Sequence, residues 1–386
     1  MRRIYLDHTA TTPLDPRVME AMRPCFSGTF GNASSIHAYG REARETLERA
    51  RGIIAEAIGA ESAEVFFTSG GTESDNLAIT GVMSAVRGRN GLVTSSSEHH
   101  AVLDPCMHLA ESGKDVSFLP VESSGAVDMD ALRAHVGDGT ALVSIMHANN
   151  ETGTITDIPA ISAILRGAGA LFHTDAVQSA GKIPVNVRDM GVDLMTLSAH
   201  KMHGPKGIGA LFVRRGVPVD PLLRGGGQER GRRPGTENVP LAVGFAEAFR
   251  LALGEIQEES SRLRSLRDAL EQRLRVLFPA IIVNGDGAPR LPHILNVSFG
   301  AADYPLEGEM LVMNMDLEGI AVTSGSACTS GSLEPSHVIR AMGRDENTAK
   351  ATLRFSFGRS NTMDDVDYVA ERLDIVVRRM LKKPSR

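Results

Sequence analysis

Two charged residues at the ends of buried stretches could do chemistry in this 386-residue chain. Lys201 follows the mostly apolar run at residues 192–197, and Asp175 follows a similar run at residues 170–173. Open α/β sheets place their ligands at such carboxyl ends of strands. A lysine that forms a Schiff base and an aspartate that keeps a ring nitrogen charged suit pyridoxal phosphate. Either residue alone is more often a solvated loop residue or a helix cap, so the pair carries the prediction.

Residues 68–73, Thr-Ser-Gly-Gly-Thr-Glu, lie between a predicted strand and a predicted helix. Gly70 and Gly71 allow the backbone to approach an anion, and the N-terminus of the helix supplies unpaired N–H groups. Thr72 adds a hydroxyl group. The run matches neither the GxxxxGK[ST] nor the GxGxxG pattern of nucleotide-binding loops. A plain tight turn with Thr72 as the N-cap is an equally good interpretation of this run alone.

Three further polar positions could complete a site. His99 and His100 are adjacent, so their side chains diverge and cannot share a metal ion. His99 is either a surface residue or a ring that stacks on a flat cofactor and transfers protons. The amides at residues 149–153 follow a predicted strand and either reach a ligand or form a turn. Arg354 lies in a predicted strand and is either a clamp for a carboxylate or one half of a surface ion pair.

Cys328 has an unusual context for a cysteine. Its neighbours at residues 324–332 are mostly Ser, Gly, Ala and Thr, whereas a structural cysteine normally has apolar neighbours. A free exposed thiol is a liability, so this context predicts a reactive nucleophile. The other two cysteines, Cys25 and Cys106, lie in apolar contexts and are expected to be structural.

The composition excludes several classes of protein. The net charge is −6 and Trp is absent, so no footprint for nucleic acid is expected. The chain has no apolar run of signal-peptide or membrane-span length, which predicts a cytoplasmic protein without a membrane partner. The three cysteines show no CxxC spacing, so neither a disulfide framework nor a permanent zinc site is expected.

Helical and strand patterns alternate from about residue 40 to residue 215, which predicts an α/β fold with a mainly parallel sheet covered on both faces. The predicted elements in this part are helices at 41–58, 72–86 and 158–167 and strands at 65–68 and 142–146. A long helix between Pro240 and Pro279 could bridge two domains. Beyond it we expect strands at 294–299 and 352–357 and helices at 307–318, 335–341 and 363–381, the last with Thr362 and Asp365 as a capping box. We therefore predict a large domain at 13–259 and a smaller α+β domain formed by 1–12 and 260–386.

The motifs described above, in their order along the chain, resemble those of the NifS/IscS-type cysteine desulfurases of the class-V aminotransferase family. The similarity runs from Tyr5 to Ser356, and its most specific segments are residues 68–76, 149–153, 200–201, 231–238 and 324–335. The resemblance implies a fold-type I, aminotransferase-like homodimer with a seven-stranded sheet that uses pyridoxal 5'-phosphate.

The resemblance also implies which residues bind the cofactor. It makes Lys201, and not Lys206, the Schiff-base lysine, and His99 the stacking acid–base histidine. It makes Asp175 the partner of the pyridine nitrogen and Gln178 the donor to the ring hydroxyl. The residues that match ligands of the phosphate are Gly71, Thr72, Ser198, His200 and, from the other subunit, Thr236.

The remaining implied roles concern the substrate and the sulfur. Asn150 matches a residue near cofactor and substrate, Arg354 the clamp on the substrate carboxylate, and Cys328 the persulfide cysteine. The implied reaction removes sulfur from L-cysteine, leaving L-alanine and a persulfide on Cys328. That sulfur then serves iron–sulfur cluster assembly, including nitrogenase clusters, or another transfer pathway. A transient iron–sulfur ligand role for Cys328 stays open.

Alternatives remain at this point. A selenocysteine lyase or another β-carbon lyase would share the fold and cofactor. An inactive sulfur carrier or assembly partner belongs to a different class, and the intact Lys201, His99 and Cys328 argue against it. The expected partners are L-cysteine, a second subunit and an iron–sulfur scaffold protein or other acceptor. Many relatives have a longer C-terminal tail that contacts the scaffold, so the sequence leaves that contact open.

Overall fold

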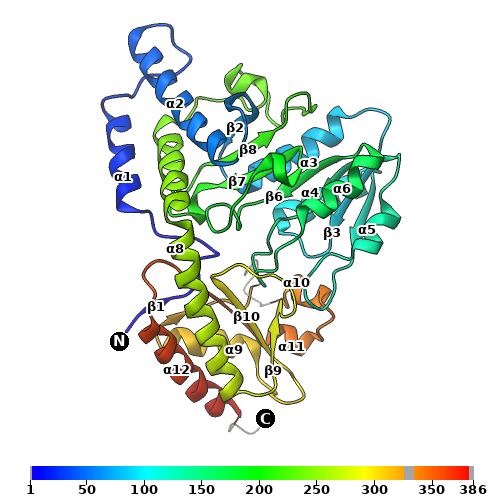
Figure 1. The fold of residues 1–386 in the computed structure, drawn as a ribbon, viewed down its shortest axis with the longest axis vertical. Coiled ribbons are helices and arrows are strands. Elements are labelled where there is room, and N and C mark those ends of the chain that lie inside the picture. Colours follow the sequence, from blue (N-terminus) through cyan, green and yellow to red (C-terminus); the bar gives the residue numbers. More distant parts are fainter. Residues whose placement is uncertain (1, 326–333, 382–386) are drawn as a thin grey trace.

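The computed structural model describes residues 2–325 and 334–381, and its larger part is built around one seven-stranded sheet (Figure 1). Its strands are β2 (Val65–Thr68), β3 (Gly91–Ser95), β4 (Asp115–Leu119), β5 (Thr140–Ser144), β6 (Leu171–Asp175), β7 (Leu194–Ser198) and β8 (Gly209–Val213). They lie in the order β2-β8-β7-β6-β5-β3-β4, and all pairs are parallel except those that β8 makes with β2 and β7. The predicted seven-stranded, mainly parallel sheet is confirmed.

Helices cover both faces of this sheet, as the alternating pattern predicted. They are α1 (Pro16–Met22), α2 (Ala38–Ala57), α3 (Gly71–Ala85), α4 (His100–Glu111), α5 (Met129–His135), α6 (Ile158–Ala168) and α7 (Val187–Met190), with 3-10 turns η1 (Arg23–Phe26), η2 (Ser62–Glu64), η3 (Ala199–Lys201) and η4 (Gln228–Gly231). Apolar residues of α2, α6 and α7 share one buried cluster, and those of α3 and α4 share another. Phe66 and Phe67 of β2 belong to different clusters because successive side chains on a strand face opposite sides.

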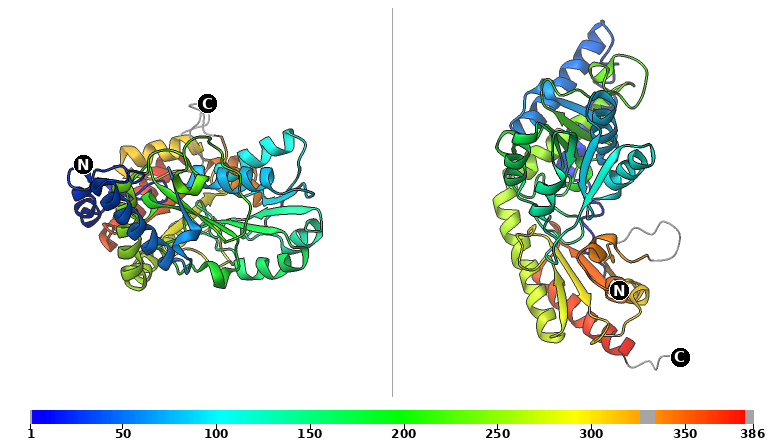
Figure 2. Two further views of the ribbon diagram at one scale, coloured as in Figure 1. Left: turned by 90° about the horizontal axis from the view of Figure 1, so that it is seen from above. Right: turned by 90° about the vertical axis from the view of Figure 1, so that its right-hand side faces the viewer.

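The second part of the chain is a smaller α+β unit. Its elements are β1 (Ile4–Tyr5), α8 (Val239–Leu277), β9 (Ile281–Asn284), β10 (Ile294–Phe299), α9 (Gly308–Leu317), β11 (Ile320–Ala321), α10 (His337–Ala341), α11 (Glu346–Lys350), β12 (Thr352–Ser356) and α12 (Met363–Leu381). A three-stranded antiparallel sheet has the order β12-β10-β9, and β1 pairs in parallel with β11. The right-hand view of Figure 2 shows the N-terminus at the level of this C-terminal part, in keeping with the pairing of β1 with β11.

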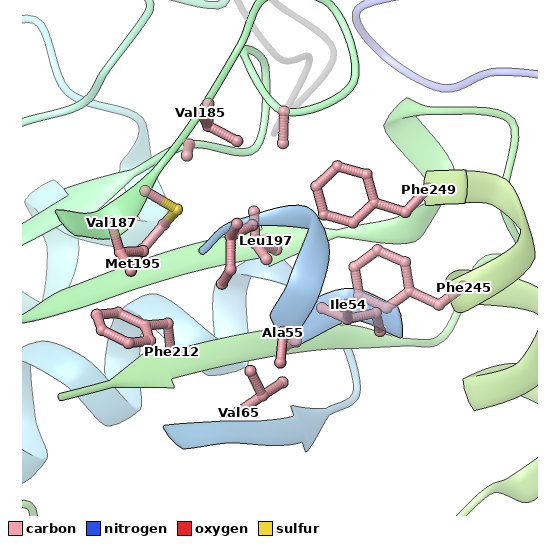
Figure 3. Close-up of a cluster of buried hydrophobic side chains, with 14 of the residues drawn as sticks. Ile54, Ala55, Val65, Val185, Val187, Met195, Leu197, Phe212, Phe245 and Phe249 are labelled. Carbon is pink, nitrogen blue, oxygen red and sulfur yellow. The ribbon is translucent and has the colours of Figure 1, made fainter. Parts of the chain in front are cut away.

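The long helix predicted after Pro240 is present as α8, and it contributes to two cores. Phe245 and Phe249 pack beside Ile54 of α2 in the core of the large sheet (Figure 3). Further along α8, Leu266 and Leu270 are buried in a separate core with Ile4, Leu6 and residues of α12. The two cores support the predicted large domain at 13–259 and the predicted small domain formed by 1–12 and 260–386. The exact domain boundaries stay a prediction.

Most of the predicted element boundaries lie within a few residues of those in the structure. Gly59, the predicted stop of α2, follows its C-cap and has a φ of +71°. Thr362 and Asp365 form the predicted reciprocal bonds of a capping box before α12. Among the residues that the structure describes, no helix has both the length and the apolar composition needed to cross a membrane.

Candidate active site

A cavity of about 500 Å³, open to solvent, lies where β5, β6 and β7 end. The residues predicted from sequence that line it are Gly71, Thr72, His99, Asn150, Asp175, Gln178, Ser198, His200 and Lys201. They come from the start of α3, the start of α4, the connection after β5, the end of β6, the end of β7 and the turn η3. Parallel strands bring their carboxyl ends to one edge of a sheet, so the topology gathers residues from distant parts of the chain.

Lys201 ends the short turn η3, directly after β7, and its side chain is half-buried. Its Nζ donates hydrogen bonds to the carbonyl oxygens of Thr9 at 2.6 Å and Ala10 at 2.8 Å. Burial and the charge of Arg354 lower the pKa of Lys201 to about 8, against the opposing effect of Asp175. A substantial fraction of this amine is therefore neutral near physiological pH, which a nucleophilic amine requires.

Asp175 is the last residue of β6 and is buried. One carboxylate oxygen accepts a hydrogen bond from the backbone N–H of Val177 at 2.8 Å. Burial raises the pKa of Asp175 to about 6, although this bond and the charge of Lys201 both lower it. The cavity therefore presents a carboxylate that a nearby positive charge would keep ionised.

His99 is the N-cap of α4, and this role fixes its tautomer. Its Nδ1 accepts a hydrogen bond from the backbone N–H of Ala101 at 3.1 Å, so the proton of the neutral ring is on Nε2. Burial and the charge of Lys201 lower the pKa of His99 to about 4. The imidazole is neutral near pH 7, and it can donate a proton through Nε2 or accept one there once that proton has left.

The part of the cavity formed by the start of α3 and the end of β7 is suited to a phosphate group. The N-cap of α3, Gly70, makes no side-chain hydrogen bond to the helix, so the first N–H groups of α3 have no capping side chain. Ser198 at the end of β7 has a buried hydroxyl without a hydrogen-bond partner among the described residues. A buried hydroxyl normally has a hydrogen-bond partner. The uncapped N-terminus of α3 and the unpaired hydroxyl of Ser198 therefore fit the phosphate of a bound cofactor.

Hydrogen bonds connect the cavity to segments that are distant in the sequence. They involve Gln178, Asn150 and Arg354. Gln178 donates from Nε2 to the carbonyl oxygen of Thr9 at 3.1 Å, and its second amide hydrogen remains for a ligand. The carbonyl oxygen of Asn150 accepts from Nη1 of Arg354 at 2.9 Å. Arg354 is buried and also binds Asp7 through Nη2 at 2.9 Å, so it is one half of an ion pair, although that pair is not at the surface. The clamp role stays a prediction. The Nε atom of Arg354 is buried with no partner in the described chain, and a substrate carboxylate could accept from it.

The sequence prediction missed two buried acids at this site. Asp75 lines the cavity, and its Oδ1 has no hydrogen-bond partner among the described residues and lies 3.6 Å from Nε2 of His173. Glu98 accepts a hydrogen bond from Ser95 at 2.6 Å and from the backbone N–H of Met146. Burial raises the pKa of Asp75 well above its usual value and that of Glu98 to about 8. Helical spacing could have identified Asp75, because it follows Thr72 by three residues on one face of α3.

Three predicted residues do not line this cavity. Arg354 is connected to it through the hydrogen bond to the carbonyl oxygen of Asn150. The other two are Thr236 and Cys328. Thr236 lies in a separate pocket that also involves Ser69 and Arg233. Arg233 forms an ion pair at 2.8 Å with Glu73, and Glu73 accepts from the backbone N–H of Ser69 in the glycine turn. The loop that carries Thr236 is thus tied to the outer side of the turn predicted to bind phosphate. Cys328 lies outside the described residues.

Comparisons with known proteins agree with this geometry. The family model for class-V aminotransferases matches residues 4–369. A cysteine desulfurase of Gluconacetobacter diazotrophicus is 50% identical over 382 residues, covering 98% of this chain and 94% of the relative. The cysteine desulfurase IscS of Dictyoglomus turgidum is 46% identical over 381 residues, covering 98% and 95%. A solved structure of a NifS-like protein superposes with a TM-score of 0.90 at 37% identity, covering 98% of this chain and all of that one.

The chain therefore belongs to the class-V aminotransferases and, within that family, to the cysteine desulfurases. Members of this group depend on pyridoxal phosphate, and the cavity has the lysine, the buried carboxylate and the uncapped helix N-terminus that this cofactor needs. The protein is a pyridoxal-phosphate enzyme.

The lowered pKa of Lys201 generates a prediction about cofactor loading. The amine must lose its proton before it attacks an aldehyde, so adduct formation by the cofactor-free protein should rise about tenfold per pH unit below the pKa. The rate should level off above about pH 8. The measurement is borohydride trapping at a series of pH values, followed by mass spectrometry of the peptides.

Two variants serve as controls. Lys201→Ala should trap no adduct. Lys206 is exposed, so Lys206→Ala should behave as the wild type. An adduct on a peptide without Lys201, or a rate independent of pH, would contradict the assignment.

Proposed function

We propose that this protein removes sulfur from L-cysteine, releases L-alanine and retains the sulfur as a persulfide on Cys328. The observation that carries the proposal is the meeting of Lys201, Asp175 and neutral His99 in one cavity. The reaction balances without an external oxidant. The Cβ–S bond of the substrate breaks and a sulfur–sulfur bond forms to Cys328. Of the two thiol hydrogens, one ends on the substrate carbon, which becomes the methyl group of alanine, and the other stays on the persulfide. The carbon is reduced as the transferred sulfur is oxidised.

Different residues of the chain bind the substrate, transfer protons and hold the cofactor in its protonated form. Arg354 binds the carboxylate of cysteine through the part of its guanidinium that Asp7 and Asn150 leave open. Lys201, with its lowered pKa, takes a proton from the substrate and returns one, and His99 exchanges a proton through Nε2. Bound pyridoxal phosphate supplies an electron sink next to these groups. Asp175 holds a proton on the ring nitrogen, which makes that sink effective.

Cys328 is the sulfur acceptor that the other cysteines cannot replace. The chain has three cysteines, and both of the others are buried. Burial raises the pKa of Cys106 to about 12 and also raises the pKa of Cys25. Because the thiolate is the attacking form, neither buried thiol is suited to nucleophilic attack. The Ser- and Gly-rich context of Cys328 supports this role for it.

We infer that the enzyme works as a homodimer in which Thr236 binds the cofactor phosphate of the partner subunit. Thr236 does not line the cavity of its own chain. Its loop is held in shape by Arg51, which forms a buried ion pair with Glu229 at 2.7 Å. Several large apolar side chains of the large domain are exposed, among them Phe26, Phe30 and Leu223. A second copy of the chain would cover them.

We propose a cytoplasmic location and an iron–sulfur scaffold protein or another sulfur acceptor as the next partner. The name IscS among the relatives supports the assembly of iron–sulfur clusters as the purpose of the sulfur. A persulfide is suited to such transfer, because a thiolate of the acceptor can attack its outer sulfur.

The shared site can be tested by mixing subunits. Thr236→Ala should weaken cofactor binding by about ten- to hundredfold, since a hydrogen bond to a charged phosphate is lost. Lys201→Ala should form no covalent adduct. When the two variants are refolded together, each mixed dimer should contain one complete site, so about a quarter of the wild-type sites should recover. Sedimentation should show dimers throughout. Failure to recover tight sites in mixed dimers would show that Thr236 serves its own chain.

The role of Cys328 has its own test. Cys328→Ser should keep the cofactor and the spectral change induced by cysteine, because the residues proposed to bind them line the cavity or, in the case of Arg354, bond to Asn150 of its lining. Alanine formation should fall at least about a hundredfold, since a serine hydroxyl stays protonated and is a poor nucleophile toward sulfur. Cys25→Ala is the matched control and should retain turnover per loaded site. Wild-type alanine formation by Cys328→Ser would remove this residue from the mechanism.

A further inference from the structure

Ser356, the last residue of β12, is fully buried, and the reaction described above does not use its side chain. Its hydroxyl group forms three hydrogen bonds, all with the N-terminal segment. Oγ donates to the carbonyl oxygen of Leu6 at 3.3 Å and accepts from the backbone N–H of Thr9 at 3.0 Å and from Oγ1 of Thr9 at 3.1 Å. A hydroxyl has one donor and two acceptor sites, so these bonds use all of them. The N-terminal segment is therefore fixed to β12 at Thr9.

The same segment holds the amine of Lys201. Its Nζ donates to the carbonyl oxygens of Thr9 and Ala10, at 2.6 and 2.8 Å. The carbonyl oxygen of Thr9 also accepts from Nε2 of Gln178, and the N–H of Ala10 donates to the carbonyl oxygen of Asp7 at 3.1 Å. Both residues that accept from the amine are thus held in place by further hydrogen bonds.

These two bonds leave one free position on Nζ. A neutral amine has two hydrogens and one lone pair, so donation of both hydrogens fixes the direction of the lone pair. In the protonated amine the third hydrogen takes that place. Lys201 lines the catalytic cavity, whereas Thr9 and Ala10 are not among the residues that line it. The free position therefore faces the cavity, where a lone pair can attack an aldehyde and a proton can be transferred.

Strand β12 also carries the predicted substrate clamp. Arg354 precedes Ser356 by two residues, so both side chains lie on the same face of the strand. Arg354 binds Asp7 of the same N-terminal segment. Through this segment, one strand of the small unit is connected both to the predicted clamp and to the predicted Schiff-base lysine at the edge of the large sheet.

We propose that Ser356 is a positioning residue that holds Thr9 and thereby directs the free position of the Lys201 amine into the catalytic cavity. Ser356 does not line the cavity, so it acts through Thr9. Without its hydroxyl, Thr9 loses two hydrogen bonds and its carbonyl group can turn away from the amine. Attack on an aldehyde requires aligned orbitals as well as contact, so a small rotation is costly. The inference rests on the proposed role of Lys201.

The first test measures how fast the cofactor-free protein forms the borohydride-trapped adduct with pyridoxal phosphate. The rate is taken per folded molecule and above the pKa of Lys201, which is about 8. Ser356→Ala should slow adduct formation at least about tenfold, since misplacement of a reacting group by about 1 Å has effects of this size or larger.

Ser298→Ala is the matched control. Ser298 is a fully buried serine of the neighbouring strand β10, and its hydroxyl bonds to Asn284 and Thr352 instead of the N-terminal segment. This variant should form the adduct at the wild-type rate per folded molecule. A purely structural role of Ser356 predicts that both serine variants lose stability and that neither changes this rate.

Turnover of the cofactor-loaded enzyme provides a second readout. Ser356→Ala should lower kcat per loaded site at least about tenfold, because the same amine exchanges protons with the substrate. KM for cysteine should change little, since Arg354 keeps its bonds to Asp7 and Asn150.

Thr9→Val provides a second variant if Ser356→Ala does not fold. Valine replaces the hydroxyl of Thr9 by a methyl group, and the backbone N–H of residue 9 still donates to Ser356. Adduct formation should slow, although less than in Ser356→Ala. The double variant should be no slower than Ser356→Ala alone, because both changes remove the bond between the two hydroxyls.

Several outcomes would overturn the positioning role. They are a wild-type rate of adduct formation in Ser356→Ala and Thr9→Val, an equal loss of rate in Ser298→Ala, and a loss of turnover confined to KM. Lys201→Ala is measured in parallel. An adduct in that variant defeats the proposed role of Lys201, whereas its absence combined with wild-type rates in Ser356→Ala and Thr9→Val defeats the positioning role alone.

Discussion

The site depends on keeping one buried carboxylate of the cavity lining, that of Asp175, ionised. No lysine or arginine among residues 2–325 and 334–381 forms an ion pair with it, and burial raises its pKa to about 6. Burial and the charge of Asp175 raise the pKa of both Asp75 and Glu98, and the charge of Glu98 also raises the pKa of Asp75. A surplus of carboxyl groups in low dielectric favours a ligand that brings a positive charge. The protonated ring nitrogen of pyridoxal phosphate is such a charge. In the chain without cofactor, the charge of Lys201 also lowers the pKa of Asp175.

The start of α3 and the end of β7 have the opposite preference. The uncapped N-terminus of α3 and the unpaired hydroxyl of Ser198 favour an anion. A flat ligand with a cationic ring edge and an anionic phosphate therefore has one favourable orientation. The sheet makes this possible because β6 and β7 pair in parallel and end at the same edge. The N-terminal segment completes the arrangement, since Thr9 accepts from both Lys201 and Gln178 and Asp7 binds Arg354.

Features that follow from local chemistry could be predicted from the sequence. Lys201 and Asp175 were predicted because an apolar run that ends in a charged residue and a turn is visible without a structure, and α8 was predicted because its leucines repeat with a helical period. Contacts between distant segments could not be predicted. The ion pair of Arg354 with Asp7 joins residues 347 positions apart, and no local pattern marks either partner for the other. Asp75 resembled an ordinary residue of the first helical turns, and Ser356 an ordinary residue of a strand. The roles of the site residues remain predictions that the geometry supports.

The claim that Asp175 keeps the cofactor ring charged is tested most directly by NMR of the holoenzyme loaded with pyridoxal phosphate labelled at the ring nitrogen. The chemical shift of that nitrogen distinguishes its protonated from its neutral form. We predict a protonated nitrogen in the wild type throughout the neutral pH range and a neutral nitrogen in Asp175→Ala, because the ion pair stabilises the protonated ring only while the carboxylate is present. A neutral ring nitrogen in the wild type, or a nitrogen that stays protonated in Asp175→Ala, would contradict the account.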